Sequence, residues 1–374
     1  KYDLALIKAE VRCAAAGVYT TNKVCGAPIK VDRAHLADGY AQAIVVNSGN
    51  ANTCAANGVA LAEECCALVG KALNIDAKDV LPASTGVIGQ PMVIDPFARG
   101  IPAAAEKLAA TAHGSTDAAT AIMTTDTHKI QFELGGKVCT VGAIGKGSGM
   151  IAPNMATMLA FYTTDAAVSP ALLEKALKTV VPGTYNQMSV DLDTSTNDTL
   201  IIMASGLAGN PEICEENADY AAFVAALTAI AEHMCAEHAG DGEGATHLIT
   251  CEVTHAPDLK TARAVSRSVV CSNLFKAAVF GRDANWGRIL CAIGYTPGDF
   301  SIDKVCVWLS SKAGEVYVCE NAAYHPYSED EAAKVLAEHD ILVKVDMGTG
   351  EASAKAWGCD LTYDYVKING DYRT

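Results

Sequence analysis

Lys146-Gly-Ser-Gly-Met-Ile-Ala-Pro-Asn-Met-Ala-Thr-Met-Leu159 is the segment on which the fold assignment of this 374-residue chain depends. With Gly145 just before it, three glycines and a proline surround one lysine, which is typical of a backbone held in an unusual path. A phosphate-binding loop would need glycine five residues before a Gly-Lys pair and Ser or Thr directly after the lysine. Those positions hold Thr140 and Gly147, so the segment does not match a nucleotide-binding loop.

Around this segment, hydrophobic spacing indicates both helices and strands. Apolar residues recur at helical intervals over Gly58–Leu73, and Ser169-Pro170 is typical of a helix start. Helices are expected at 58–73, 102–112, 170–180, 220–236 and 328–338, and strands at 4–19, 43–46, 138–144, 200–204, 305–309, 315–319, 341–345 and 361–368. Because strands and helices do not alternate regularly, the pattern favours an α+β fold over a doubly wound parallel sheet.

Composition limits the class of protein. Half of the residues are hydrophobic, enough to form a large core, and the formal net charge of −15 argues against general nucleic-acid or anionic-membrane binding. No run approaches the roughly 18 apolar residues of a membrane span. The 14 cysteines include no C-x-x-C pair, so we expect buried thiols in a reducing cytoplasm.

Four other segments hold candidate functional groups, each with a plainer alternative. The Thr85-Gly86 pair could form an oxyanion hole or an ordinary strand-ending turn. In Gly240–Thr246, Glu243 could reach a ligand or could be a solvated loop acid. The aspartates of 190–199 lack the glycine and the glutamate of a calcium loop, so turns and caps are favoured. The His and Cys residues of 233–251 diverge on a helix, so no metal site is expected.

Taken together, these segments resemble the ornithine acetyltransferase (glutamate N-acetyltransferase) family. The matching stretches run in family order over nearly the whole chain: 17–22, 45–52, 84–89, 122–127, 146–159, 193–199, 240–246, 283–288 and 364–374. The sequence departs from the family pattern at Leu192, where glycine is expected, at Arg282, where an acid is common, and at Ala152, where histidine is frequent. None of these three positions has an assigned role.

The resemblance implies specific residue roles and a specific fold. Thr157 would be the nucleophile, Ala156–Thr157 the self-cleavage site, and Thr85 with Gly86 the oxyanion hole. The substrate-binding positions would be Thr124, Lys146, Thr157, Glu243, Asn369 and Thr374. The implied fold is two stacked β-sheets between helix layers, with a smaller C-terminal α/β portion. Residues 1–156 and 157–374 would be the α and β pieces of one intertwined fold, assembling as α2β2.

The implied chemistry suits an N-terminal threonine. A threonine hydroxyl needs a base, and the α-amine freed by cleavage has a reference pKa of about 7.7–8.0, near the working pH. The expected reaction is ping-pong acetyl transfer from N2-acetyl-L-ornithine to L-glutamate in arginine biosynthesis. No metal or cofactor is expected, with acetyl-CoA as a further co-substrate to test. The alternative is a self-processing amidohydrolase or aminopeptidase that passes its acyl group to water.

Overall fold

The computed structural model describes residues 3–122, 127–152 and 158–371, with 14 strands and 11 α-helices in these ranges. The strands are β1 (Leu4–Tyr19), β2 (Tyr40–Asn47), β3 (Val80–Ser84), β4 (Thr127–Leu134), β5 (Lys137–Lys146), β6 (Leu159–Thr164), β7 (Met188–Ser189), β8 (Thr199–Ala204), β9 (Leu248–Ala256), β10 (Cys306–Ser311), β11 (Gly314–Glu320), β12 (Ala323–Tyr324), β13 (Asp340–Asp346) and β14 (Ala352–Cys359). The helices are α1 (Ala27–His35), α2 (Gly58–Leu73), α3 (Asp95–Ala105), α4 (Ala112–Ala121), α5 (Pro170–Val180), α6 (Ala218–Gly240), α7 (Leu259–Val270), α8 (Asn273–Phe280), α9 (Trp286–Gly294), α10 (Glu329–Val335) and α11 (Tyr363–Asp371).

The first sheet has seven strands in the order β3-β2-β1-β8-β6-β5-β4. Strand β1 belongs to both of its halves: Leu4–Ala14 pairs with β2, and Ala14–Tyr19 pairs with β8, with a register shift between Lys8 and Cys13. A bulge of this kind bends a strand and increases its twist. The two halves consequently face each other, and one apolar cluster combines β2 and β3 residues such as Ile44 with Phe161 of β6.

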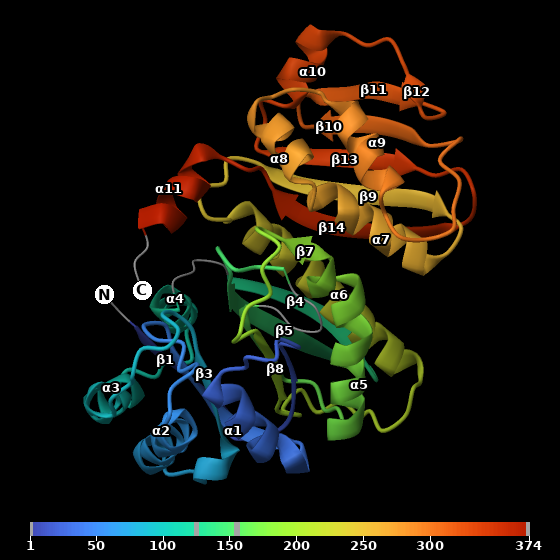
Figure 1. Ribbon diagram of the computed structural model, residues 1–374. Helices are drawn as coiled ribbons and strands as arrows, with labels where there is room; N and C mark the ends of the chain where they lie inside the picture. Colours follow the sequence, from blue (N-terminus) through green and yellow to red (C-terminus); the bar gives the residue numbers. More distant parts are fainter. Residues whose placement is uncertain (1–2, 123–126, 153–157, 372–374) are drawn as a thin grey trace.

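Helices cover both outer surfaces of this bent sheet (Figure 1). Helices α1, α2 and α3 enclose a second apolar cluster over β2 and β3, with Val31, Cys66 and Phe97 among its members. Helices α5 and α6 cover β4, β5, β6 and β8, where Leu173 and Phe223 are fully buried. The N-terminal part is therefore a helix layer, two facing sheet halves and a second helix layer.

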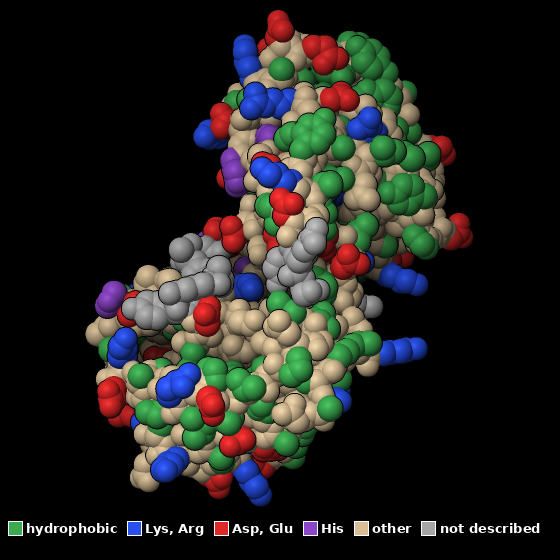
Figure 2. Space-filling model, turned by 60° about the vertical axis from the view of Figure 1, so that its left-hand side comes forward, with side chains coloured by type: hydrophobic (Ala, Val, Ile, Leu, Met, Phe, Trp, Pro, Cys, Tyr) green, Lys and Arg blue, Asp and Glu red, His purple; other side chains and the backbone are tan. Residues whose placement is uncertain are grey.

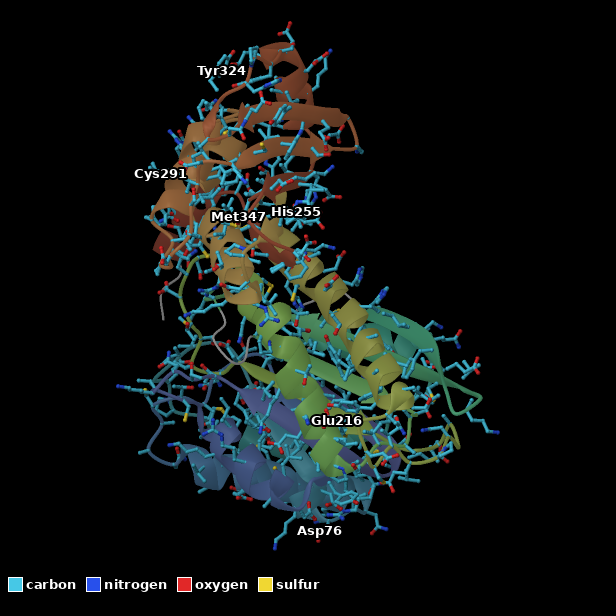
Figure 3. The ribbon with its side chains drawn as sticks, turned by 90° about the vertical axis from the view of Figure 1, so that its right-hand side faces the viewer. Asp76, Glu216, His255, Cys291, Tyr324 and Met347 are labelled. Atoms are coloured by element: carbon cyan, nitrogen blue, oxygen red, sulfur yellow. The ribbon has the colours of Figure 1, made fainter. Side chains whose placement is uncertain are left out.

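The C-terminal lobe contains the second seven-stranded sheet, ordered β12-β11-β10-β13-β9-β14-β7. Its core lies between this sheet and helices α7, α8, α9 and α10, with Val253 and Ile293 fully buried. Helix α6 contacts strands of both sheets, including β5 and β14, so it joins the two parts of the molecule. Figure 2 shows a narrower waist between the lobes, and in Figure 3 Asp76 and Tyr324 mark opposite ends of the molecule.

The sequence-based prediction of an α+β fold with two sheets and helix layers is confirmed. Two local predictions were wrong. The strand expected at 361–368 is helix α11, because the chain leaves the sheet at Cys359 and the Thr362 hydroxyl accepts the Tyr365 N–H at 3.2 Å. The helix expected at 102–112 is divided, since α3 ends at Ala105 and Thr111 caps the start of α4. No described helix has the length and hydrophobicity needed to span a bilayer.

The hydroxyls of two tyrosines join β6 to the short 3-10 turn, Tyr185–Gln187, that lies between α5 and β7. The Oη atoms of Tyr162 and Tyr185 lie 2.7 Å apart, and both side chains are almost fully buried. Each hydroxyl is therefore the hydrogen-bond partner of the other at a site that water does not reach. A buried polar group that loses its partner typically costs about 1–3 kcal/mol.

Tyr162→Phe should lower the free energy of unfolding by about 1–3 kcal/mol, because it leaves the Tyr185 hydroxyl unpaired. The double variant Tyr162→Phe/Tyr185→Phe should cost less than the sum of the two single variants, since neither ring then carries an unpaired hydroxyl. Urea unfolding of the four proteins measures this, with exposed Tyr295→Phe as the matched control. Simple additivity of the two single changes would contradict the pairing.

Candidate active site

The 146–159 segment connects two neighbouring strands of the first sheet. Lys146 is the last residue of β5 and pairs with Leu159, the first residue of the antiparallel strand β6. Both ends of the segment are thus fixed by sheet hydrogen bonds. Leu159 is also paired with Thr199, the first residue of the parallel strand β8. The start of β8 therefore lies directly beside the point where the segment re-enters the sheet.

The first half of the segment is held by polar residues just before β8. The carboxylate of Asp191 accepts the N–H groups of Met150 and Ile151 at 2.6 and 2.9 Å. The hydroxyl of Thr194 donates to the Ala152 carbonyl at 2.8 Å. An irregular loop leaves its backbone groups without ladder partners, and these side chains supply them. The interpretation of residues 190–199 as turn and cap residues agrees with these contacts.

The described end of the segment is held in the same way. The N–H of Met158 donates to the Oδ1 atom of Asp198 at 2.7 Å, and its carbonyl accepts the Thr199 N–H at 2.6 Å. Asp198 is 1% exposed. Burial, the largest effect, raises its pKa well above that of an ordinary carboxyl, although hydrogen bonds from Met158 and Ser195 oppose the shift. The environment therefore favours the neutral acid.

The Thr85-Gly86 turn follows β3 and packs against the turn after β2. The N–H of Thr85 donates to the Asn47 carbonyl at 2.8 Å. The Thr85 hydroxyl is therefore the donor group of this residue that could bind a substrate oxygen. Gly86 has a φ of +125°, and a Cβ there would lie 2.8 Å from the Gly49 carbonyl carbon. Only glycine fits that combination of backbone conformation and close approach.

Asn197 connects this turn to the start of β8. Its Nδ2 atom donates to the carbonyls of Ala51 and Ser84, at 2.6 and 2.9 Å. Its Oδ1 atom accepts the Thr53 hydroxyl at 2.6 Å. Because Ser84 directly precedes Thr85, the predicted oxyanion turn and the 146–159 segment are both attached to residues 197–199.

Glu243 lies between the segment and the C-terminal helix. Its N–H donates to the Ser148 carbonyl at 2.7 Å, and its Oε2 atom accepts the Asn369 Nδ2 hydrogen at 2.9 Å. A Cβ on Gly149 would lie 2.5 Å from the Glu243 carboxyl carbon, so glycine permits this approach. The carboxylate therefore contacts two other parts of the chain, which argues against a merely solvated loop acid.

The structure brings the described candidate residues together around one segment. Lys146 ends β5, Glu243 and Asn369 are hydrogen-bonded to each other, and the Thr85-Gly86 turn is joined to residues 197–199. Four candidates lie outside the described residues: Thr124, Ala156, Thr157 and Thr374.

Sequence reasoning missed Asp191, Asn197 and Asp198 as residues of this site. The signal was the density of acids, amides and hydroxyls between 190 and 199, which indicated turns without revealing what they hold. Leu192, where the family pattern has glycine, has a φ of +73°, a conformation that glycine adopts without strain. Leu192 therefore adopts a backbone conformation that suits glycine, at some cost in conformational energy.

The histidines and cysteines of 233–251 are spread through the structure. His247 Nδ1 lies 2.9 Å from an Asp360 carboxylate oxygen, while His233 stacks on His128. His238 is buried against Gly145, and that burial lowers its pKa to about 3. Within residues 3–122, 127–152 and 158–371, no group of three or more His, Cys, Asp or Glu residues is arranged to hold a metal ion.

A large hollow lies elsewhere in the N-terminal part. Its volume is about 1160 Å³, and residues of β1, α3, α4 and β6 line it, Lys8, Lys107 and Phe161 among them. None of the described candidate residues lines this hollow. We therefore place the candidate active site at the 146–159 segment, where the polar groups converge.

Gly86→Ala should lower the free energy of unfolding more than Gly89→Ala does. Both glycines have a positive φ, but an alanine Cβ at position 86 would meet the Gly49–Asn50 backbone, whereas nothing lies within 4 Å at position 89. Strain at a positive φ costs about 1–2 kcal/mol, and the clash adds to it at position 86 alone. Urea unfolding of both variants measures the difference, and equal losses would contradict the close approach of the two turns.

Comparison with known proteins places the chain in a family. The ArgJ family model matches residues 1–374. The "Arginine biosynthesis bifunctional protein ArgJ" of Symbiobacterium thermophilum is 50% identical over 383 residues, covering 100% of this chain and 93% of that protein. Its namesake from Caldanaerobacter subterraneus is 48% identical over 379 residues, covering 100% and 94%.

A solved structure also matches. The crystal structure of arginine biosynthesis bifunctional protein ArgJ from Bacillus halodurans is 41% identical with a TM-score of 0.52, and covers 56% of this chain and 97% of that one. The sequence match spans every segment that forms the candidate active site, including 84–89, 146–159, 190–199 and 240–246. The chain described here belongs to the ArgJ family.

Proposed function

We propose that this protein cuts its own chain between Ala156 and Thr157 and then uses Thr157 to transfer acetyl groups from N2-acetyl-L-ornithine to L-glutamate. Members of the ArgJ family are acyltransferases of arginine biosynthesis, and this chain is one of them. One structural observation carries the assignment to this site. Residues 197–199 hold both the Thr85-Gly86 turn and the residue that follows Thr157.

Self-cleavage would begin with attack of the Thr157 hydroxyl on the Ala156 carbonyl. The resulting ester is opened by water, which leaves a carboxyl group on Ala156 and an α-amine on Thr157. Residues 1–156 and 157–374 would then be separate pieces of one fold.

Acetyl transfer would use the same hydroxyl in two half-reactions. The α-amine takes the hydroxyl proton while the oxygen attacks the acetyl carbonyl, and the proton passes to the leaving nitrogen of ornithine. The acetyl group remains on Thr157 as an ester until the amine of glutamate attacks it. The Thr85 hydroxyl and the Gly86 N–H would stabilise each oxyanion, and one such donor is typically worth roughly 3–4 kcal/mol of barrier.

The remaining candidates would bind the two amino acids. Lys146 would pair with the α-carboxylate that both substrates share, and Glu243 with an amine of ornithine. Thr124, Asn369 and Thr374 would complete the binding site. Because the relatives are called bifunctional, acetyl-CoA is proposed as a second acetyl donor. The pieces would assemble as α2β2 in the cytoplasm, without a metal or cofactor.

Thr157→Ala should remain a single uncut chain, whereas wild type should give two pieces divided between Ala156 and Thr157. Thr157→Ser keeps both the hydroxyl and the future amine, so it should still be cut. Intact-mass spectrometry of the denatured proteins measures this outcome. An uncut wild-type chain with full acetyl transfer would contradict the mechanism.

The same wild-type preparation distinguishes the transferase from a hydrolase. With acetylornithine and glutamate present, the transferase should form ornithine and acetylglutamate in equal amounts. Free acetate in place of acetylglutamate would instead identify the self-processing amidohydrolase. Release of ornithine without glutamate should stop after one turnover if the acetyl ester resists water.

Glu243→Gln should raise the KM for acetylornithine about tenfold, as expected for the loss of one charge-assisted contact. Glutamine still accepts the Asn369 hydrogen bond, so the local arrangement should survive. Glu237→Gln, which neutralises an exposed acid on α6, is the matched control and should leave KM unchanged. Steady-state kinetics with each substrate varied in turn measures both variants. An unaltered acetylornithine KM in Glu243→Gln would remove this assignment.

A further inference from the structure

Asp198 holds the backbone immediately after the proposed nucleophile. Both polar backbone groups of Met158 are bound by consecutive residues, the N–H by the Asp198 carboxyl and the carbonyl by the Thr199 N–H. Thr199 is at the same time the first residue of β8 and is paired with Leu159. Met158 is therefore attached to a strand end in the middle of the first sheet.

Met158 needs such a restraint because of its backbone conformation. Its φ is +39°, which lies in the left-handed region and is unusual for a residue other than glycine. Conformations of this kind cost about 1–3 kcal/mol and persist where the surroundings determine them. The side chain of Met158 is also 5% exposed, so packing adds to the two hydrogen bonds.

The burial of the Asp198 carboxyl costs free energy of folding. Its Oδ2 atom is buried and has no hydrogen-bond partner among the described residues. No described cationic side chain forms an ion pair with it, and a buried unpaired carboxylate is strongly unfavourable. A neutral acid avoids most of that cost while its other oxygen still accepts the Met158 hydrogen bond.

The preceding residue performs the same task for the opposite side of the site. Asn197 binds the Ser84 carbonyl beside Thr85, while Asp198 binds the Met158 N–H beside Thr157. Two adjacent side chains just before β8 therefore hold the residues next to Thr85 and next to Thr157. Displacement of a reacting group by about 1 Å can cost about 100-fold in rate.

We propose that Asp198 is a positioning residue that fixes the backbone following the nucleophile through its hydrogen bond from Met158. The inference rests on the proposed function, in which Thr157 attacks first its own chain and then substrate. Because Asp198 contacts the backbone of the chain, its loss should lower the rates of both reactions and leave substrate binding unchanged.

The test compares Asp198→Ala with Asp198→Asn. Alanine removes the acceptor for the Met158 N–H, so self-cleavage and the kcat of acetyl transfer should fall about 100-fold, with both KM values within about threefold of wild type. Asparagine keeps an acceptor oxygen without a charge, so kcat should recover to within about fivefold of wild type. The pH dependence of kcat in Asp198→Asn should stay close to that of wild type, because the hydrogen bond to Met158, and not a charge on residue 198, positions the backbone.

Asp32→Ala is the matched control. Asp32 is also fully buried, and burial likewise raises its pKa, but it lies on α1 against Tyr19 and does not contact Met158. The Asp32→Ala variant should be less stable than wild type but should not show the 100-fold loss of kcat. Hydrogen exchange of the Met158 amide gives a readout that does not need activity, and it should accelerate in Asp198→Ala but not in Asp32→Ala.

Three results would overturn the inference: wild-type kcat in Asp198→Ala, a loss confined to KM, or Asp198→Asn as inactive as Asp198→Ala. If Asp198→Ala does not fold, the kcat and the Met158 exchange rate of Asp198→Asn decide the question. A wild-type protein that neither cuts itself nor transfers acetyl groups would refute the proposed function instead. The Met158 exchange rates would then still establish whether Asp198 holds this backbone.

Discussion

The candidate site depends on how the backbone of the 146–159 segment finds hydrogen-bond partners. The segment leaves β5 at Lys146 and returns to the sheet at Leu159, and the sheet ladder serves only its ends. Buried backbone groups without partners are rare because each costs as much as a lost hydrogen bond. In the described parts of the segment, side chains of residues 191–198 and the loop at Glu243 supply partners.

The bend of the first sheet brings the polar residues of the site together. The bend in β1 brings the two halves of the first sheet face to face, and the ends of β2 and β3 then meet the start of β8. In the strand order β3 and β8 are separated by two strands, so a flat sheet could not form the contact between Asn197 and Ser84. The site exists because the sheet bends.

The helix at the C-terminal end depends on the same contacts. The Thr362 hydroxyl donates to the Gly244 carbonyl at 2.7 Å, and Asn369 binds Glu243. Glu243 in turn holds Ser148 through its N–H. Although α11 buries none of its residues, it is connected to the segment through two steps of hydrogen bonding. A change at α11 can therefore reach the site without passing through either hydrophobic core.

The sequence predicted local structure well where one face of an element is buried. Helix α2 has the expected bounds, Gly58–Leu73, because its apolar residues face α1, α3 and β3. Helix α11 was mistaken for a strand because it has no buried face, and its apolar and polar residues alternate. The resemblance named Glu243 and the Thr85-Gly86 turn as candidates, and contacts with Ser148 and Asn197 place both near the segment. The roles of Asn197 and Asp198 could not be predicted, because their partners lie about 40 residues or more away along the chain.

The burial of Asp198 also suits the chemistry proposed for its neighbour. A threonine α-amine acts as a base only when it is unprotonated, and a nearby negative charge would stabilise its ammonium form and raise its pKa. Met158 directly follows Thr157 in the chain, so a charged carboxylate bound to the Met158 N–H would favour the protonated form of the amine proposed for Thr157. The burial that raises the pKa of Asp198 favours the uncharged acid, which can hold the backbone without favouring the protonated form of that amine. A buried acid at this position therefore combines rigid placement with little electrostatic cost to the reaction.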